Sequence, residues 1–397
     1  MRVLHVVPTY LPATRYGGPI YSVHGLARAL VTEGCDVHVY TTNVDGPGVS
    51  DVPLGTPMLR DGVNVTYFST GFGRRVYRAP AMGLALAEVT ANFDIVHLHS
   101  VFLWPTSAAA AAARAARVPY LLAPRGMLVA DLLRRKSALA KWAWILALER
   151  RNLAQAAAVH VTSELEARDL RNLGLKTRRI VVVPNGIDDA AVADPNECGA
   201  ANRHGQPNIL FLGRITWKKG LDRLIAAMAR VPQATLTIAG NDEEGLQTTL
   251  EQQAQEQGIA ARVVFVGPVS GSAKSLLLRT ASVFVLPSHS ENFGIAVLEA
   301  MAAGCPVIVS AEVGLADTVR KAGAGLVSPT DPEGLARSIT ALLADPELRL
   351  RMGAAGRAEA TGRFGWQAIA AQMMEVYRQC VASHCEARAG AISRPRS

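Results

Sequence analysis

The sequence lacks a long uninterrupted apolar run. Even the alanine-rich segment 107–116 contains Arg114 and is soon followed by Arg117, so it is too short and too polar to span a membrane. The chain also lacks the basic patch and apolar stretch of a signal peptide, because its first residues form an alternating run typical of a strand. We therefore expect a cytoplasmic protein without a membrane-spanning helix.

Cysteine is scarce and irregularly spaced. The five cysteines lack the paired spacing of a metal site, and their odd number fits a reducing compartment: Cys35, Cys198, Cys305, Cys380 and Cys385. The chain has no Asp-x-Asp triplet, and no histidine spacing along the sequence is typical of metal ligands. The sequence therefore predicts no metal and no cofactor.

Acidic residues are in short supply in the first half of the chain. Residues 1–190 hold 21 Lys and Arg against 14 Asp and Glu, a net charge of +7, whereas the remainder holds 20 against 19, a net charge of +1. The surplus favours contact with anionic lipid or a phosphate-bearing acceptor, and ordinary solubilising surface charge explains it equally well. We expect no nucleic-acid partner.

Hydrophobic residues are abundant: they make up 49% of the 397 residues, enough for two domain cores. In the first half, short β-rich runs alternate with helical patterns, which indicates α/β units around a parallel sheet. The runs are residues 3–7, 37–40, 95–98, 120–122, 159–161 and 180–183. They predict an N-terminal Rossmann-like domain over residues 1–190.

A second series of β-rich runs follows a segment rich in Pro, Gly, Asp and Asn, which marks a linker over residues 191–207. The runs are residues 209–212, 236–239, 263–266, 283–286 and 307–309. They predict a C-terminal Rossmann-like domain over residues 208–365. The last helix, residues 366–385, is expected to cross the domain junction, with a flexible tail over residues 386–397. Two facing domains of this kind bind ligands beyond the carboxyl ends of their strands.

Two motifs follow predicted strands of the first half. Gly17 and Gly18 precede a helix with a proline in its first turn, where the backbone can approach phosphate oxygens. Ordinary turn chemistry explains the glycine pair equally well. His99 ends the run 94–99, where it can hydrogen-bond a sugar hydroxyl or support charge at a reacting carbon. A lone histidine is more often a satisfied core residue, as we expect of His97.

Two cations converge on the loop after the predicted strand 209–212. Arg214 follows a glycine, and Lys219 precedes another glycine at the start of the next helix. A guanidinium and an ammonium beside a helix N-terminus neutralise a diphosphate and stabilise the charge that develops as it leaves. A solvated charged turn is the alternative, and the glycines on both sides favour a binding site.

A pair of glutamates follows the predicted strand 283–286. Glu291 begins the segment Glu-Asn-Phe-Gly, and Glu299 lies a little over two helical turns later, so it can sit deeper on the helix face that Glu291 begins. Carboxylates of this kind accept hydrogen bonds from the vicinal hydroxyls of a ribose or hexose, and backbone amides at the helix start point toward an anion. Surface glutamates often show the same spacing, but Glu299 stands inside the apolar run 295–303.

From residue 1 to about residue 383, the chain resembles the retaining glycosyltransferases of family four, the glycosyl transferases group 1, which have the GT-B architecture of two facing Rossmann-like domains. Three segments carry the resemblance, in the order and spacing of that family's donor site. They are Gly213-Arg214-Ile215 with Lys219-Gly220, Glu291-Asn292-Phe293-Gly294, and Glu299-Ala300-Met301-Ala302-Ala303-Gly304. The segment Asn-Gly-Ile-Asp at 185–188 is similar to the family's interdomain turn.

The resemblance implies a role for each matching residue. Arg214 and Lys219 hold the diphosphate, and Glu299 holds the ribose. Glu291 and the backbone amides of Asn292, Phe293 and Gly294 contact the transferred sugar. Gly18, preceded by Gly17, lets the backbone approach the phosphate, and His99 lies near the sugar. The family retains stereochemistry at the anomeric carbon, so Glu291, His99, Arg214 and Lys219 are assigned to catalysis by front-face attack, with no covalent intermediate required.

Two features fall outside the family's general pattern. Arg125 follows a predicted strand of the first domain, which suggests contact with an acceptor or a phosphate. The segment 132–148 mixes Lys and Arg with Leu, Trp and Ile, a combination typical of a helix on a membrane surface. A core helix with a charged exposed end explains this segment as well. Acceptors of related enzymes are often polyprenyl diphosphate-linked glycans, which places the protein peripherally on the inner face of the plasma membrane.

The sequence therefore predicts a metal-independent hexosyltransferase that uses a nucleotide diphosphate sugar and a glycan or polyprenyl diphosphate-linked acceptor, in bacterial cell-surface or exopolysaccharide synthesis. A sugar-nucleotide epimerase of the same architecture and a non-catalytic nucleotide-sugar-binding protein are the alternatives. The joint presence of two cations and two glutamates argues against the second. The base and the sugar of the donor are left open, because backbone groups and variable loops make those contacts.

Overall fold

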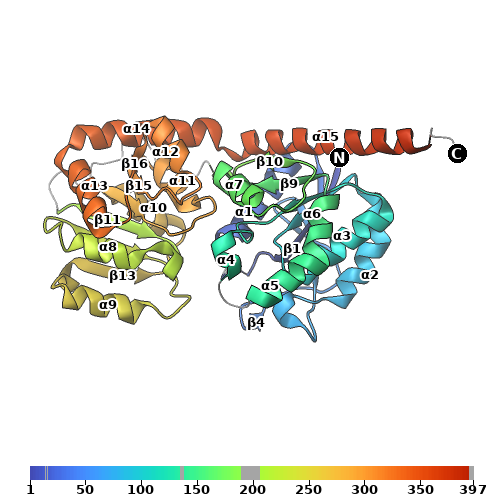
Figure 1. Cartoon of the computed structure of the whole chain (residues 1–397), viewed down its shortest axis with the longest axis horizontal. Coiled ribbons are helices and arrows are strands. Elements are labelled where there is room, and N and C mark those ends of the chain that lie inside the picture. The colour runs from blue at the N-terminus through green and yellow to red at the C-terminus, as the bar shows by residue number, and fades with distance from the viewer. Residues whose placement is uncertain (14, 16, 135–137, 189–205, 393–397) are drawn as a thin grey trace. The chain divides into compact units, whose positions relative to one another are not determined.

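The computed structural model describes residues 1–13, 15, 17–134, 138–188 and 206–392, and it divides into two compact units (Figure 1). The first consists of Met1–Gly186 with Trp366–Ser397, and the second of Ile187–Gly365. Each unit is built on a parallel sheet with helices, which confirms the predicted α/β class with two Rossmann-like sheets. The predicted linker over residues 191–207 lies, as far as residue 205, outside the described residues.

The first unit contains an eight-stranded sheet in the order β10-β9-β8-β7-β1-β2-β6-β5. Neighbouring strands are parallel except β5 and β6, and a separate antiparallel pair is formed by β3 and β4. The strands are β1 (Arg2–Thr9), β2 (Asp36–Thr42), β3 (Val44–Asp45), β4 (Gly48–Val49), β5 (Met58–Arg60), β6 (Val63–Phe68), β7 (Ile95–His99), β8 (Tyr120–Ala123), β9 (Ala158–Val161) and β10 (Ile180–Val182).

Helices cover both faces of this sheet because successive strand residues point to opposite sides. Val3 belongs to a core cluster with residues of α1 and α15, whereas the next residue, Leu4, belongs to a different cluster with residues of α2, α3, α6 and α7. The helices are α1 (Gly18–Thr32), α2 (Pro80–Val89), α3 (Trp104–Ala116), α4 (Ala130–Arg134), α5 (Ala138–Trp144), α6 (Arg150–Gln155), α7 (Glu164–Asn172) and α15 (Trp366–Ile392), with a π-helical turn, η3 (Ile145–Glu149), between α5 and α6.

The last helix belongs to the first unit, and it is longer than predicted. α15 packs against α1, and the indole of Trp366 lies so close to Gly25 and Gly186 that a Cβ on either would come within 2.4 Å of a ring atom. The helix continues to Ile392, past its predicted end at residue 385, and the flexibility of the tail stays a prediction. That this helix crosses a domain junction stays a prediction.

The second unit contains a six-stranded parallel sheet in the order β13-β12-β11-β14-β15-β16, the dinucleotide-fold order. Its strands are β11 (Asn208–Leu212), β12 (Thr235–Ala239), β13 (Val263–Gly267), β14 (Val283–Leu286), β15 (Val307–Val309) and β16 (Gly325–Val327). Its helices are α8 (Leu221–Met228), α9 (Gln247–Glu256), α10 (Gly271–Thr280), α11 (Ile295–Ala302), α12 (Ala316–Ala322), α13 (Pro332–Ala344) and α14 (Pro346–Arg363), after the 3₁₀ turn η6 (Trp217–Lys219).

The strand order reverses once in each sheet, between β1 and β7 in the first unit and between β11 and β14 in the second. Loops that leave neighbouring strands at such a point diverge to opposite faces, and ligands bind in the crevice they leave. Among the described residues, no helix combines the length and the apolar character needed to cross a bilayer.

Candidate functional site

In the second unit, glycines let the loops after neighbouring strands approach one another closely. A Cβ on Gly220, whose φ is 66°, would lie 2.2 Å from the carbonyl oxygen of Pro287, which follows β14. A Cβ on Gly240, just after β12, would lie 1.8 Å from the carbonyl oxygen of Gly213, just after β11. Both distances are far below contact distance, so only glycine fits, and the predicted diphosphate loop 213–220 is clamped from two sides.

This clamp brings Lys219 into contact with Glu291. The Lys219 ammonium donates a hydrogen bond to Oε2 of Glu291, and both side chains are mostly buried, with exposed fractions of 16% and 19%. Burial raises the pKa of the Glu291 carboxyl, but the Lys219 and Arg214 cations outweigh burial and hold the pKa below its usual value. The carboxyl is therefore ionised at neutral pH, as the predicted sugar-binding role requires.

The other predicted cation, Arg214, lies against a carboxylate that the sequence analysis did not single out. Its guanidinium contacts Glu243 at 2.6 Å, and the next residue, Glu244, accepts a hydrogen bond from the backbone N–H of Trp217 at 2.9 Å. Both glutamates follow β12, so this strand end holds the cation loop. The Arg214–Glu243 pair is almost half exposed, and an exposed pair of this kind adds little stability.

The segment Glu291 to Gly294 is braced by the loop that follows β15. The backbone N–H groups of Gly314 and Leu315 donate to the carbonyl oxygens of Glu291 and Phe293 at 2.9 and 3.1 Å. The side chain of Phe293 is buried in the core, so only its backbone is available to a ligand. Gly294, with φ of 96°, then starts α11, which leaves the helix N-terminus at the switch point of the strand order.

Glu299, on α11, forms an ion pair that the sequence analysis missed. Lys274 of α10 donates to Oε1 of Glu299 at 2.9 Å, and the carboxylate side chain is 18% exposed. The partner was invisible in the sequence because α10 and α11 are joined through β14, and only their packing brings the two residues together. Lys274 fixes the orientation of the carboxylate that is predicted to hold a ribose.

In the first unit, His99 ends β7 and is 1% exposed. Arg125 donates to its Nδ1 at 3.0 Å and to Oδ1 of Asn185 at 3.1 Å. Because a guanidinium only donates, the His99 proton sits on Nε2, which donates to Nδ1 of His5 at 2.9 Å. Both ring nitrogens of His99 are therefore engaged within the protein, and its predicted hydrogen bond to a sugar stays a prediction.

A second chain of hydrogen bonds runs beside the first. His160 Nε2 donates to the carbonyl oxygen of Val183, so His160 Nδ1 accepts from His97 Nε2 at 3.1 Å. The free Nδ1 of His97 then accepts from the hydroxyl of Tyr377, on α15, at 2.7 Å. The expectation that His97 is a satisfied core histidine agrees with these contacts.

All four histidines of these chains are neutral. Burial, together with the Arg125 cation, lowers the pKa of His5 and of His160 to about 3. Burial likewise holds the pKa of His97 and of His99 well below the usual value. Arg125 stays protonated, although burial lowers its pKa to about 10.

The fold also gathers three histidines that no sequence spacing indicated. One ring nitrogen from each of His5, His97 and His99 lies within 4.8 Å of the others, a grouping that could hold a metal ion. Spacing along the sequence does not indicate this grouping, because His5 meets His97 and His99 only through the pairing of strands β1 and β7. However, His99 Nε2 bonds to His5 Nδ1, the nitrogens of His97 bond to His160 and Tyr377, and the Arg125 cation contacts His99, so the donor set fits a hydrogen-bond network better than a cation, although His5 Nε2 has no partner among the described residues.

The backbone around His99 and Arg125 is strained. Ser100, Phe102 and Arg125 all have positive φ, of 73°, 62° and 56°, which non-glycine residues seldom adopt. Two buried glutamates hold these loops: Glu149 accepts from the N–H of Phe102, and Glu166 accepts from the N–H of Gly126. Burial raises the pKa of both carboxyls. Strain of this kind, held by the surroundings, is typical of functional sites.

The predicted site residues thus fall into two groups, one in each unit. In the second unit Lys219 contacts Glu291 and Arg214 acts on the same carboxylate, after the ends of β11 and β14; Asn292, Phe293 and Gly294 follow Glu291, and Glu299 lies on α11, paired with Lys274. In the first unit His99 contacts Arg125, while Gly17, with φ of 66°, caps α1 and Gly18 begins it. The first-unit network of His5, His160 and Tyr377 was missed, because its members come from separate strands and from the last helix.

Comparison of the sequence with known families gives two matches. Residues 199–359 match the family described as "Glycosyl transferases group 1", and residues 17–186 match the "Glycosyl transferase 4-like domain". A glycogen synthase of Mycobacterium tuberculosis is 31% identical over 95% of this chain and 94% of its own length. A D-inositol 3-phosphate glycosyltransferase of Xylanimonas cellulosilytica is 32% identical over 96% of both chains.

The fold has close counterparts among solved structures. The sucrose-phosphate synthase of Thermosynechococcus elongatus superposes with a TM-score of 0.77 at 25% sequence identity, covering 96% of this chain and 99% of the other. Both the fold and the whole length of the chain therefore have characterised counterparts.

Proposed function

The chain belongs to the group 1 glycosyl transferases of family four, and from this premise we propose that it is a retaining hexosyltransferase acting on a nucleotide diphosphate sugar. The observation that carries the proposal is the buried contact between Lys219 and Glu291 where the strand order of the second unit reverses. A cation suited to a diphosphate and a carboxylate suited to sugar hydroxyls are held there on two adjacent strand ends.

The second unit binds the donor. Arg214 and Lys219 take the diphosphate, and the half-exposed Glu243 yields Arg214 to the incoming phosphate at little cost. Glu299, oriented by Lys274, accepts hydrogen bonds from the ribose hydroxyls. Glu291 accepts from hydroxyls of the transferred sugar, which lies against the N-terminus of α11.

In the reaction, the bond from the anomeric carbon to the diphosphate oxygen breaks, and the acceptor oxygen forms the new bond on the same face of the sugar. A departing phosphate oxygen takes the acceptor proton. Arg214 and Lys219 stabilise the charge that grows on the leaving diphosphate, which lowers the barrier because the interaction strengthens in the transition state. Glu291 orients the sugar and forms no covalent bond to it.

We propose that the reaction needs no metal ion, because the two cations assigned to the diphosphate, Arg214 and Lys219, supply the positive charge that a metal would otherwise bring. The acceptor, a glycan or a polyprenyl diphosphate-linked glycan, is assigned to the first unit. There Arg125 has five N–H groups and uses three in its contacts with His99 and Asn185, which leaves donors for an acceptor phosphate. The proposed setting is cell-surface or exopolysaccharide synthesis, with the protein cytoplasmic and peripheral on the inner face of the plasma membrane.

A screen of UDP- and GDP-sugars tests the proposal. The true donor raises the melting temperature by binding only the folded protein, and adding EDTA leaves both donor binding and transfer to a glycan acceptor unchanged. Conversion of the donor sugar to its epimer without an acceptor would establish an epimerase instead. Donor binding without any turnover would establish a binding protein, and activity lost in EDTA and restored by Mg²⁺ would overturn the metal-free mechanism.

A further inference from the structure

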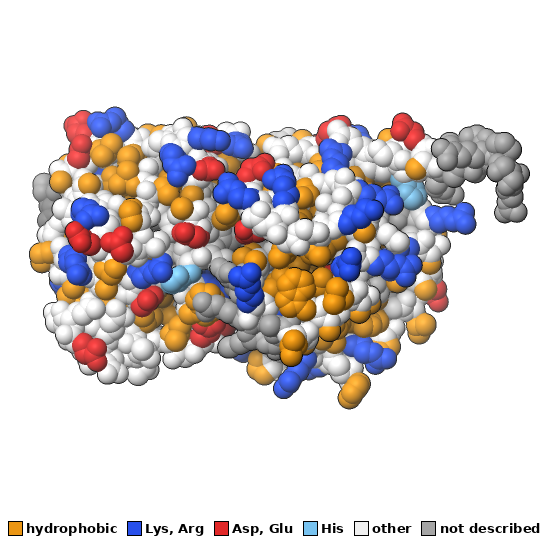
Figure 2. Space-filling model, in the orientation of Figure 1, with side chains coloured by type: hydrophobic (Ala, Val, Ile, Leu, Met, Phe, Trp, Pro, Cys, Tyr) orange, Lys and Arg blue, Asp and Glu red, His pale blue; other side chains and the backbone are white. Residues whose placement is uncertain are grey.

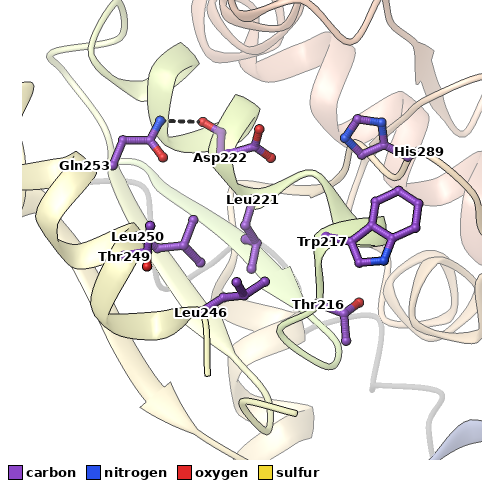
Figure 3. A pocket seen from close by; sticks show the side chains of 9 residues that line it. All are labelled: Thr216, Trp217, Leu221, Asp222, Leu246, Thr249, Leu250, Gln253 and His289. Atoms are coloured by element: carbon purple, nitrogen blue, oxygen red, sulfur yellow. Dashed lines mark hydrogen bonds between the residues drawn. The ribbon is translucent and has the colours of Figure 1, made fainter. Parts of the chain in front are cut away.

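The second unit contains a pocket apart from the donor residues (Figure 3). Its volume is about 230 Å³, and it is bordered by the loop after β11, by α8 and α9, and by the loop after β14. The lining residues are Thr216, Trp217, Leu221, Asp222, Leu246, Thr249, Leu250, Gln253 and His289. None of the residues assigned to the diphosphate, the ribose or the transferred sugar is among them.

The size of the pocket limits what it accepts. Clefts that enclose drug-sized ligands measure about 300–1,000 Å³, so this pocket is too small for a nucleotide sugar and suits a single ring. Its charge limits the ligand further, because the lining contains no Lys or Arg, and its one carboxylate, Asp222, repels anions. The pocket therefore disfavours a phosphate-bearing ligand and suits a neutral one.

The pocket is lined by both apolar and polar side chains. The indole of Trp217, with the His289 ring beside it at a centroid distance of 5.7 Å, faces Leu246 and Leu250 across the pocket (Figure 3). The polar lining consists of the Asp222 carboxylate, the hydroxyls of Thr216 and Thr249, and Gln253, which donates to the Asp222 carbonyl oxygen at 2.8 Å and so keeps its amide oxygen available as an acceptor. These six side chains and the two leucines line the pocket with both apolar surface and hydrogen-bonding groups.

A pyranose ring matches this pocket. Its two faces carry C–H groups, which pack on an indole and on aliphatic side chains, and its edge carries hydroxyls that both donate and accept hydrogen bonds. We propose that the pocket binds one pyranose ring of a neutral glycan, at a site separate from the donor site. The proposal rests on the proposed function, since a glycosyltransferase acting on glycans supplies such a ligand as acceptor or product.

A ligand in this pocket would restrict the motion of the diphosphate loop 213–220. Trp217 lies in the loop between Arg214 and Lys219, so a sugar ring packed against its indole restrains the segment that carries both cations. The site thus holds a glycan on the second unit and steadies the diphosphate loop at the same time.

The test is a titration of the full-length protein with neutral tetrasaccharides of glucose, mannose or galactose, followed by isothermal titration calorimetry, which reads binding equally in the wild type and in the variants. We expect at least one to bind, and Trp217→Ala and Asp222→Ala each to weaken its binding about tenfold, as removal of a stacking wall or a hydrogen-bond acceptor does. Trp142→Ala, which removes an exposed tryptophan of the first unit, is the matched control and should leave the affinity unchanged.

Stabilisation by the UDP- or GDP-sugar, measured on the same variants, separates this proposal from the proposed function. Tetrasaccharide binding that is lost only in the pocket variants supports the site whether or not a donor is found. No binding of any tetrasaccharide by the wild type, or equal binding by Trp217→Ala and Asp222→Ala, would overturn the pocket and leave the donor site untouched.

Discussion

At the scale of single residues, the site is held by charges that already have partners. Lys219 contacts Glu291, Arg214 contacts Glu243, and Lys274 contacts Glu299. Paired in this way, buried and half-buried charges keep a fixed geometry without a ligand, so a donor meets groups that need little rearrangement.

Lys219→Ala is expected to lower kcat about 10²- to 10³-fold, because the ammonium acts chiefly on the charge of the leaving diphosphate. Lys218→Ala removes the same charge from the neighbouring position and serves as the matched control, for which kcat should change little. Steady-state kinetics with the identified donor measure both. Wild-type turnover in Lys219→Ala would remove this lysine from the site.

The buried histidines predict a dependence of stability on pH. His5 and His160 have folded-state pKa values of about 3, below the unfolded value of about 6.5, so the unfolded chain binds more protons as the pH falls below 6.5. The free energy of unfolding should therefore be intact above pH 7 and fall by ~1 kcal/mol per pH unit for each such group between pH 6 and pH 4.

Urea unfolding at pH 7.5, 6 and 5 measures this slope. His160→Gln keeps a donor for Val183 and an acceptor for His97 but cannot titrate. The pH dependence of its free energy of unfolding should therefore lack the contribution of about one proton. A stability that does not change between pH 7.5 and pH 5 would contradict the assignment of neutral histidines.

At the scale of elements, function depends on how strand-end loops are clamped. In the second unit the clamp is steric, through glycines that let backbone approach backbone, and in the first it is polar, through the buried carboxylates of Glu149 and Glu166. Both kinds of contact hold loops that form no helix or strand of their own.

Gly240→Ala should displace the diphosphate loop without changing any charged or polar side chain in it. The added methyl group would lie 1.8 Å from the Gly213 carbonyl oxygen, so β12 and the loop with Arg214 must move apart, and donor affinity should fall about tenfold or more. Gly245→Ala is the control, because its φ of 68° brings similar backbone strain but no atom lies within 4 Å of the new Cβ. Equal donor affinity in the two variants, measured by thermal shift, would contradict the steric clamp.

At the scale of the whole molecule, one surface of the first unit is both apolar and basic. Leu139, Trp142 and Leu146, on α5 and η3, are 89%, 41% and 61% exposed. Figure 2 shows hydrophobic side chains gathered over this helix, with Lys and Arg nearby. Glu149 of the same segment is buried, so it does not offset the positive charge at the surface.

This surface predicts peripheral binding to anionic vesicles. Binding should be much weaker to neutral vesicles and should weaken with salt, because exposed charges are screened over about 8–10 Å at ordinary ionic strength. Replacing Arg134, Arg135 and Lys136 together by Gln should reduce it while donor binding stays intact; the last two lie outside the described residues. Vesicle sedimentation checks this, and equal binding to neutral and anionic vesicles, or none to either, would mean that the acceptor is a soluble molecule.

The sequence by itself determined the two Rossmann-like sheets, because each depends on a local alternation of apolar runs and helical patterns. It also singled out Arg214, Lys219 and Glu291, near predicted strand ends, and Glu299, on the following helix, as candidate donor residues, because local patterns define those positions. Since parallel strands place their carboxyl ends on one edge, such residues meet without further information.

Only the tertiary structure decided the partners that come from distant segments. Glu243 and Lys274 meet their partners through the packing of whole elements, and His5, His160 and Tyr377 join His97 and His99 only once β1, β9 and α15 lie in place. No local pattern encodes these pairings, because their energy comes from burial and hydrogen bonds between residues that are remote along the chain.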